Sequence, residues 1–197
     1  YPMFCYQCEQ TAGGKGCTKM GVCGKTPEVA ALQDLLIYQI KGISCYAKEI
    51  VEKGENVDKD IVSFVENCLF TTLTNVNFDA DVHVELLRRS QEIKEQLRSK
   101  IGCIKNDTEH ATYNLSSTKA EMLKDAKKAG IMYDQKLDPD IRSLRQTIVY
   151  GLKGISAYGH QARELGYYDD QVDNFYIRAL EATTDDNLGV EELIRWT

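Results

Sequence analysis

Residues 26–54 read TPEVAALQDLLIYQIKGISCYAKEIVEKG, and residues 138–166 read DPDIRSLRQTIVYGLKGISAYGHQARELG. Each stretch begins with a capping residue, Thr26 or Asp138, and a proline follows in the first helical position. From Val29 onward the first stretch places apolar residues every three or four positions until a glycine ends it. This is the pattern of an amphipathic helix, so the sequence predicts two long helices of one design.

The two stretches belong to an internal repeat. Lys41-Gly42-Ile43-Ser44 matches Lys153-Gly154-Ile155-Ser156, which lies 112 positions later. The same shift places Tyr38 on Tyr150 and Tyr46 on Tyr158, so we expect these four tyrosines to face the core. A repeat of this length indicates two copies of one supersecondary unit. The predicted fold is therefore all-α, with two antiparallel three-helix bundles related by the repeat and an N-terminal cysteine-rich cluster-binding loop.

Further helices are expected at about residues 59–73, 79–101 and 118–129, because apolar residues recur there with helical spacing. A polar, aperiodic stretch separates the last two of these helices and has the composition of a linker. We expect one compact domain with four parts: the cysteine-rich loop over residues 1–26, a first helical bundle over 27–102, the linker over 103–117 and a second bundle over 118–197.

Composition excludes several classes of function. The 197 residues include 30 Asp and Glu against 24 Lys and Arg, which gives a net charge of -6 and argues against a nucleic-acid partner. No run of about 18 apolar residues exists, so no membrane segment is predicted. The N-terminus lacks the basic and apolar stretches of a secretory signal, and we expect Met3 to be the native first residue. The expected location is the reducing cytoplasm.

Four of the seven cysteines gather near the N-terminus as Cys5, Cys8, Cys17 and Cys23, with the spacing C-x2-C-x8-C-x5-C. An odd total and an uneven distribution argue against a disulfide framework, so the four thiols are predicted to be metal ligands. A C-x2-C pair directs two thiolates at one centre, and the glycine-rich spacers let the chain wrap round to the other corners. Backbone N–H groups of such a wrap can donate to cluster sulfur.

The spacing favours an iron–sulfur cluster over zinc. Structural zinc sites usually pair two short C-x2-4-C knuckles, whereas five residues separate Cys17 from Cys23. Zinc remains the alternative metal. Four thiolates suit [2Fe–2S] and [4Fe–4S] clusters equally well.

The other cysteines are not predicted to be ligands. Cys45 aligns with Ala157 and Cys68 with Leu180 in the repeat, so both are expected to be small buried apolar residues, and Cys103 to be a surface thiol. The three histidines have no nucleophile or carboxylate partner in a recognisable motif. No catalytic residue is predicted.

Several segments resemble one known family. They are MFCYQCEQTA (3–12), GCT (16–18), GVCGK (21–25), LQDLL (32–36), LTNVNF (73–78), DIRSLR (140–145) and GLKG (151–154). Together they resemble the N-terminus of hybrid cluster proteins, also called prismane proteins or hydroxylamine reductases, which are relatives of carbon monoxide dehydrogenase. The cysteine motif in its MFCYQCEQTA context is the specific part of this resemblance, which covers almost the whole chain.

The resemblance implies that Cys5, Cys8, Cys17 and Cys23 ligate a cubane [4Fe–4S] cluster, with spacers similar to the strict-anaerobe type and unlike the [2Fe–2S] type of the family. It also implies a pair of three-helix bundles. Family members continue into two α/β domains that carry a hybrid iron–sulfur–oxygen cluster, and no residue here matches its ligands. We therefore expect a fragment or natural truncation.

The function implied is an electron-transfer domain that is inactive alone, in a protein that reduces hydroxylamine to ammonia or carries out related nitric oxide reduction. The implied partners are a redox protein as electron donor and the missing C-terminal hybrid-cluster domains. The alternative is a non-redox structural or interaction module whose N-terminus is held by a zinc site.

Overall fold

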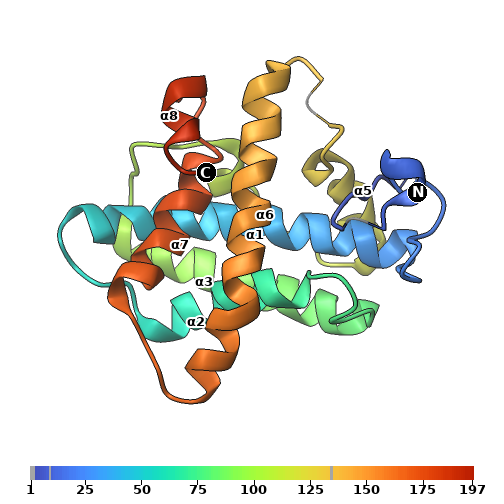
Figure 1. Ribbon diagram of the computed structural model, residues 1–197. Helices are drawn as coiled ribbons and strands as arrows, with labels where there is room; N and C mark the ends of the chain where they lie inside the picture. Colours follow the sequence, from blue (N-terminus) through green and yellow to red (C-terminus); the bar gives the residue numbers. More distant parts are fainter. Residues whose placement is uncertain (1–2, 9, 134) are drawn as a thin grey trace.

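The computed structural model describes residues 3–8, 10–133 and 135–197, and Tyr1 and Pro2 therefore lie outside the described residues. Within that part of the chain the regular elements are all helical, as the sequence predicts (Figure 1). They are η1 (Ala12–Gly14), α1 (Pro27–Glu52), α2 (Lys59–Thr71), α3 (Ala80–Ile101), α4 (Glu109–Thr112), α5 (Lys119–Ala129), α6 (Pro139–Glu164), α7 (Asp170–Ala182) and α8 (Val190–Ile194).

Helix α1 forms the centre of the molecule. Its start is set by the Thr26 hydroxyl, which accepts a hydrogen bond from the backbone N–H of Val29 at 3.3 Å, and by Pro27 at the first helical position. Its end is set by Gly54, which has a φ of 77°. Helices α3, α4, α5 and α7 all pack on α1, so most of its side chains are buried.

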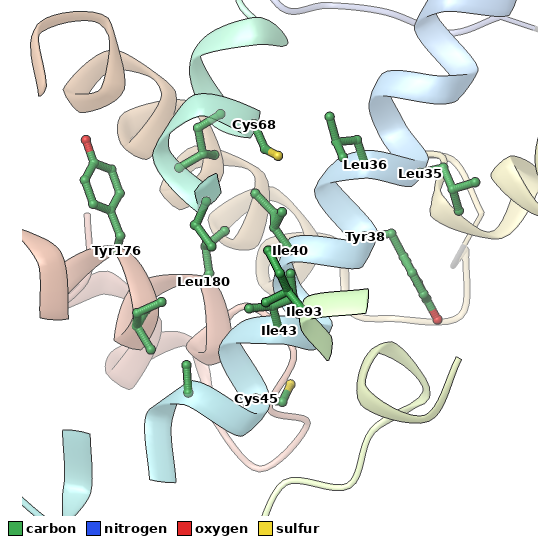
Figure 2. Packing of buried hydrophobic residues seen from close by; sticks show 14 of the residues in the cluster. Leu35, Leu36, Tyr38, Ile40, Ile43, Cys45, Cys68, Ile93, Tyr176 and Leu180 are labelled. Atoms are coloured by element: carbon green, nitrogen blue, oxygen red, sulfur yellow. The ribbon is translucent and has the colours of Figure 1, made fainter. Parts of the chain in front are cut away.

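The core is built mainly where α1 meets its neighbours. Leu36, Ile40 and Ile43 of α1 lie among side chains of α2, α3 and α7, and none of the three has any exposed surface (Figure 2). Cys45 and Cys68 are both buried among these apolar side chains, and Cys103 is exposed, as the sequence predicts for all three.

Helices α1 and α6 confirm the repeat in length, since each has 26 residues and opens on a proline. Helices α2 and α7 both have 13 residues. The surroundings of the copies differ, because α6 contacts α2, α7 and α8, and α8, which lies at the repeat position of the start of α3, has five residues against 22 in α3. Helix α6 runs across α1 in Figure 1.

This difference corrects one prediction. Tyr38 and Tyr46 of α1 are buried as expected, but Tyr150 and Tyr158 of α6 are 55% and 83% exposed. The two copies share a sequence pattern, but the face of α6 that carries these tyrosines is not covered by another described helix.

The stretch 103–117, predicted as a linker, contains α4 and packs on α1. Lys94 of α3, which is fully buried, donates hydrogen bonds to Gln39 of α1 and to the carbonyl oxygen of Tyr113. The His110 ring stacks on Tyr38 with its centroid 4.2 Å away. These contacts fasten the stretch to α1 and α3.

None of the helices in the described residues is both long enough and apolar enough to span a membrane.

Candidate functional site

Cys5 and Cys17 of the cysteine-rich loop are joined through their backbones. The backbone N–H of Cys5 donates to the carbonyl of Cys17 at 3.0 Å, and the N–H of Cys17 donates to the carbonyl of Cys5 at 2.8 Å. These reciprocal bonds form an isolated antiparallel bridge. Residues twelve positions apart thereby lie side by side, with Cys17 buried and Cys5 half-buried.

The glycines between these cysteines allow the chain to reverse tightly. Gly13 lies within η1 at a φ of 60°, a left-handed conformation that side chains disfavour. Gly16 approaches the ring of Phe4 so closely that a Cβ atom would lie 2.9 Å from its Cζ atom. The spacer therefore folds against the aromatic residue that precedes Cys5.

Cys8 and Cys23 lie on separate turns of the same loop and are half-buried. The carbonyl of Cys8 accepts hydrogen bonds from the backbone N–H of Thr11 at 3.2 Å and from its hydroxyl at 2.7 Å. Cys23 lies in a turn in which the N–H of Gly24 donates to the carbonyl of Gly21 at 2.8 Å. The Cys23 Sγ atom lies over Gly21, 3.0 Å from where a Cβ atom would be.

The four thiols are therefore carried by one loop, but the described side chains do not form a preassembled metal site. All seven cysteines are free thiols. Among the described residues no three His, Cys, Asp or Glu side chains are arranged to hold a metal ion. The donor set itself fits a thiolate-ligated metal or cluster, because the four cysteines of the loop are unpaired and only Cys17 is buried.

Charged residues that the sequence analysis did not assign to the site lie close to Cys5. Lys25 and Lys153 are buried, and the Lys153 ammonium donates to Oε1 of Gln7 at 2.8 Å. Burial raises the pKa of the Cys5 thiol, while Lys25 and Lys153 lower it and Asp34 raises it. Burial also raises the pKa of Asp34 to about 7, against the opposing effect of Lys153 and Lys25. Both lysines therefore favour a thiolate at Cys5.

One feature of the sequence pointed toward part of this group of charged residues. Lys153 belongs to the repeated Lys-Gly-Ile-Ser segment, and a lysine kept in both copies among core-facing positions is unusual. Its proximity to Gln7, which lies 146 residues earlier, could not be predicted from either segment alone.

Known proteins of one family match almost the whole chain. The Prismane/CO dehydrogenase family model matches residues 3–195. A hydroxylamine reductase of Syntrophobacter fumaroxidans is 46% identical over 185 residues, which cover 92% of this chain and 34% of that protein. Hydroxylamine reductases of Desulfovibrio desulfuricans and Zymomonas mobilis are 43% and 41% identical and are matched over 35% of their own lengths.

The chain spans about a third of the length of these relatives, and nearly all of its own length takes part in the matches. A family model that matches residues 3–195, together with these identities, shows that the chain belongs to the Prismane/CO dehydrogenase family.

Proposed function

We propose that this chain is an iron–sulfur electron-transfer module of a hydroxylamine-reductase-type protein, and that Cys5, Cys8, Cys17 and Cys23 hold a [4Fe–4S] cluster. The observation that carries the proposal is the pair of hydrogen bonds between Cys5 and Cys17, which bring distant members of the motif together on a loop of free thiols. The cluster would supply reversible one-electron storage.

The residues under the loop suit such a cluster. A thiolate-ligated cluster carries negative charge, and the buried ammonium groups of Lys25 and Lys153 oppose the rise that burial causes in the pKa of the Cys5 thiol. Cationic groups near the ligands favour the reduced, more negative state. A reducing cytoplasm, which we propose as the location, would keep the thiols available for iron.

The reaction of the whole protein is expected to need residues beyond this chain. A cluster whose four corners are filled by thiolate leaves no open position for a substrate. We propose that hydroxylamine is reduced to ammonia at a hybrid cluster in the other two thirds of a full-length protein, and that a separate redox protein supplies the electrons. The chain alone should then turn over no hydroxylamine.

The exposed side of α6 is the surface we propose for contact with that remaining polypeptide. Tyr150, Ile155 and Tyr158 lie on one side of this helix and are all exposed. Their counterparts in α1 are Tyr38, Ile43 and Tyr46, which are buried under neighbouring helices. An apolar face that is covered in one copy of a repeat and bare in the other is a suitable docking surface.

Anaerobic reconstitution with iron and sulfide tests the proposal. The expected product is brown, with a broad absorption band near about 400 nm, about four irons and four sulfides per chain, and a paramagnetic signal on one-electron reduction. Two irons per chain would favour [2Fe–2S]. A colourless protein that binds one zinc and no iron would contradict the electron-transfer proposal and favour a structural module.

A further inference from the structure

A second site of unusual composition lies between α1 and α6. It is a cavity of about 240 Å³, bordered by Tyr38 and Lys41 of α1 and by Arg145 of α6, and closed by the segments 108–110 and 183–186. One end reaches Gln7 and Lys153, but Lys41 and Arg145 have no part in the cysteine loop.

Lys41 is buried in this cavity without a counter-charge of its own. Its side chain is only 8% exposed, and no hydrogen bond or ion pair joins its ammonium group to another of the described residues. Burial, together with the neighbouring charge of Arg145, lowers the pKa of Lys41 to about 8. A buried cation beside a second cation is costly unless an anion compensates it.

Arg145 and Tyr38 supply two more unused donors. Arg145 is 9% exposed, and its Nη2 atom donates to the carbonyl of Asp185 and to the carboxylate of Asp186, both at 2.9 Å. Its Nε atom is buried and has no hydrogen-bond partner among the described residues. The same holds for the Tyr38 hydroxyl, although that side chain is 6% exposed. Figure 2 shows the Tyr38 ring directed away from the core around Ile40 and Ile43.

The acidic side chains of the cavity already interact with basic residues other than Lys41. Glu109 accepts from Lys128 at 3.2 Å, and Asp186 accepts from Arg145. The positive charges of Lys153 and Lys25 act on the Asp34 carboxyl group. In the described part of the lining, five basic residues face these three acidic ones: Lys41, Lys128, Arg142, Arg145 and Lys153. Positive charge is therefore in excess.

We propose that this cavity is a binding site for a small oxyanion, which pairs with the Lys41 ammonium and, after a shift of their side chains, accepts hydrogen bonds from Nε of Arg145 and from the Tyr38 hydroxyl, two atoms with almost no accessible surface in the structure. Charge-assisted hydrogen bonds of this kind are the strong class, and the anion would satisfy three buried donors at once. The cavity is smaller than the roughly 300 Å³ at which pockets for drug-sized ligands begin, so it suits a ligand smaller than a nucleotide. Inorganic phosphate or sulfate, or the carboxylate of a small metabolite, fits this chemistry.

Isothermal titration calorimetry on the full 197-residue chain tests the proposal, with sodium phosphate, sodium sulfate and sodium acetate as separate probes and sodium chloride at matched ionic strength as reference. Saturable one-site binding of phosphate or sulfate identifies an inorganic oxyanion, and binding of acetate alone identifies a carboxylate. If none of the three binds in excess of chloride, the proposal is wrong.

Variants assign the binding to the cavity. Lys41→Met should weaken binding by at least about tenfold, the effect of losing one charge-assisted hydrogen bond. Lys127→Met removes the same charge from an exposed position on α5 that does not line the cavity, and it should leave binding unchanged. Equal loss in both variants would show that only net charge matters and would overturn the site.

A stability measurement separates binding from a purely structural role of Lys41. Without added oxyanion, Lys41→Met should unfold at a temperature no lower than the wild type, because it removes a buried cation that lacks a partner. A saturating concentration of the oxyanion that binds should raise the unfolding temperature of the wild type and leave that of the variant unchanged. A variant that is less stable in chloride, together with a wild type that does not respond to the probe, would contradict the proposal.

Discussion

Gly42 of α1 lies directly against the backbone carbonyl group of His110. A Cβ atom added to Gly42 would lie 3.0 Å from the carbonyl carbon and still closer to the oxygen, and 3.1 Å from Cδ of Lys94. Backbone cannot rotate out of the way as a side chain can, so this contact requires the absence of a side chain at residue 42. It is the point at which the segment around α4 closes on the central helix.

The repeat provides a matched control for this contact. Gly42→Ala should lower the free energy of unfolding by about 1–3 kcal/mol, the usual cost of overpacking a close interface. Gly154→Ala, at the equivalent position of α6, meets no atom within 4 Å and should raise it by about 0.5–1 kcal/mol, because alanine is the better helix former. Urea unfolding followed by circular dichroism measures both, and equal effects would show that the packing around Gly42 is wrong.

Arg163 should be essential for joining α6 to α2 and α7. Its guanidinium lies 3.0 Å from Glu66 and is also paired with Asp173, and all three side chains are buried. Arg163→Met would leave two buried carboxylates without a cation, so we expect a loss of about 3–5 kcal/mol in the free energy of unfolding.

The exposed pair of Arg89 and Glu92, 2.9 Å apart, is the control for that change. Arg89→Met should cost no more than about 1 kcal/mol in the same urea experiment, since water and salt screen exposed pairs. Adding Glu66→Gln to Arg163→Met should restore part of the loss. A double variant that is less stable than Arg163→Met would contradict this account.

His83 should make stability depend on pH. Its Nδ1 lies 2.6 Å from the carbonyl of Asp79 and its Nε2 lies 3.2 Å from Nε2 of Gln33, which also donates to the carbonyl of Asn77. Only a neutral ring can donate at Nδ1 and accept at Nε2. Burial accordingly lowers the pKa of His83 below its usual 6.5.

The lowered pKa of His83 fixes the sign of the pH dependence. Because the unfolded chain takes up the proton more readily, the contribution of His83 is present above about pH 6.5 and is lost as the pH falls below it, by at most about 1.4 kcal/mol per unit. The pKa of His110 is lowered as well, chiefly by burial, so some dependence should persist without His83. His83→Gln should give a flatter profile between pH 7 and 5, and an unchanged slope would contradict the assignment.

The cysteines should separate into ligands and packing residues. Cys17→Ala should abolish a four-iron cluster or convert it to a three-iron form, because no other thiol of the loop can replace that ligand. The Cys45→Ala variant should keep the iron bound by the loop. Its free energy of unfolding should fall by roughly 1 kcal/mol, since the buried thiol makes only long contacts with Thr184 at 3.5 Å and Thr108 at 3.8 Å.

Iron content and far-ultraviolet circular dichroism decide the outcome, with the exposed Cys103 replaced by alanine as a neutral control. The helices from α1 onward should survive in all three variants, because their apolar faces bury against one another. Loss of iron from Cys45→Ala and its retention in Cys17→Ala would show that the ligand assignment is wrong.

The sequence alone determined the local features of this protein. Capping residues, prolines and glycines predicted both ends of α1 and α6, and apolar spacing predicted α2, α3 and α5, because these signals act within one or two turns of the chain. The spacing of four cysteines predicts a metal loop, which stays a prediction, and the structure joins only Cys5 and Cys17 through backbone hydrogen bonds. The repeat predicted that Cys45 and Cys68 are buried.

Tertiary structure decided what lies next to each copy of the repeat. Tyr46 and Tyr158 occupy the same position in the pattern, but only the first is covered, because α3 and α4 pack on α1, whereas the described helices that contact α6, namely α2, α7 and α8, leave Tyr158 exposed. The buried charges around Lys153 and Lys41 likewise depend on contacts between segments more than a hundred residues apart. Periodicity records which face of a helix is apolar, whereas burial and charge compensation depend on which partner reaches that face.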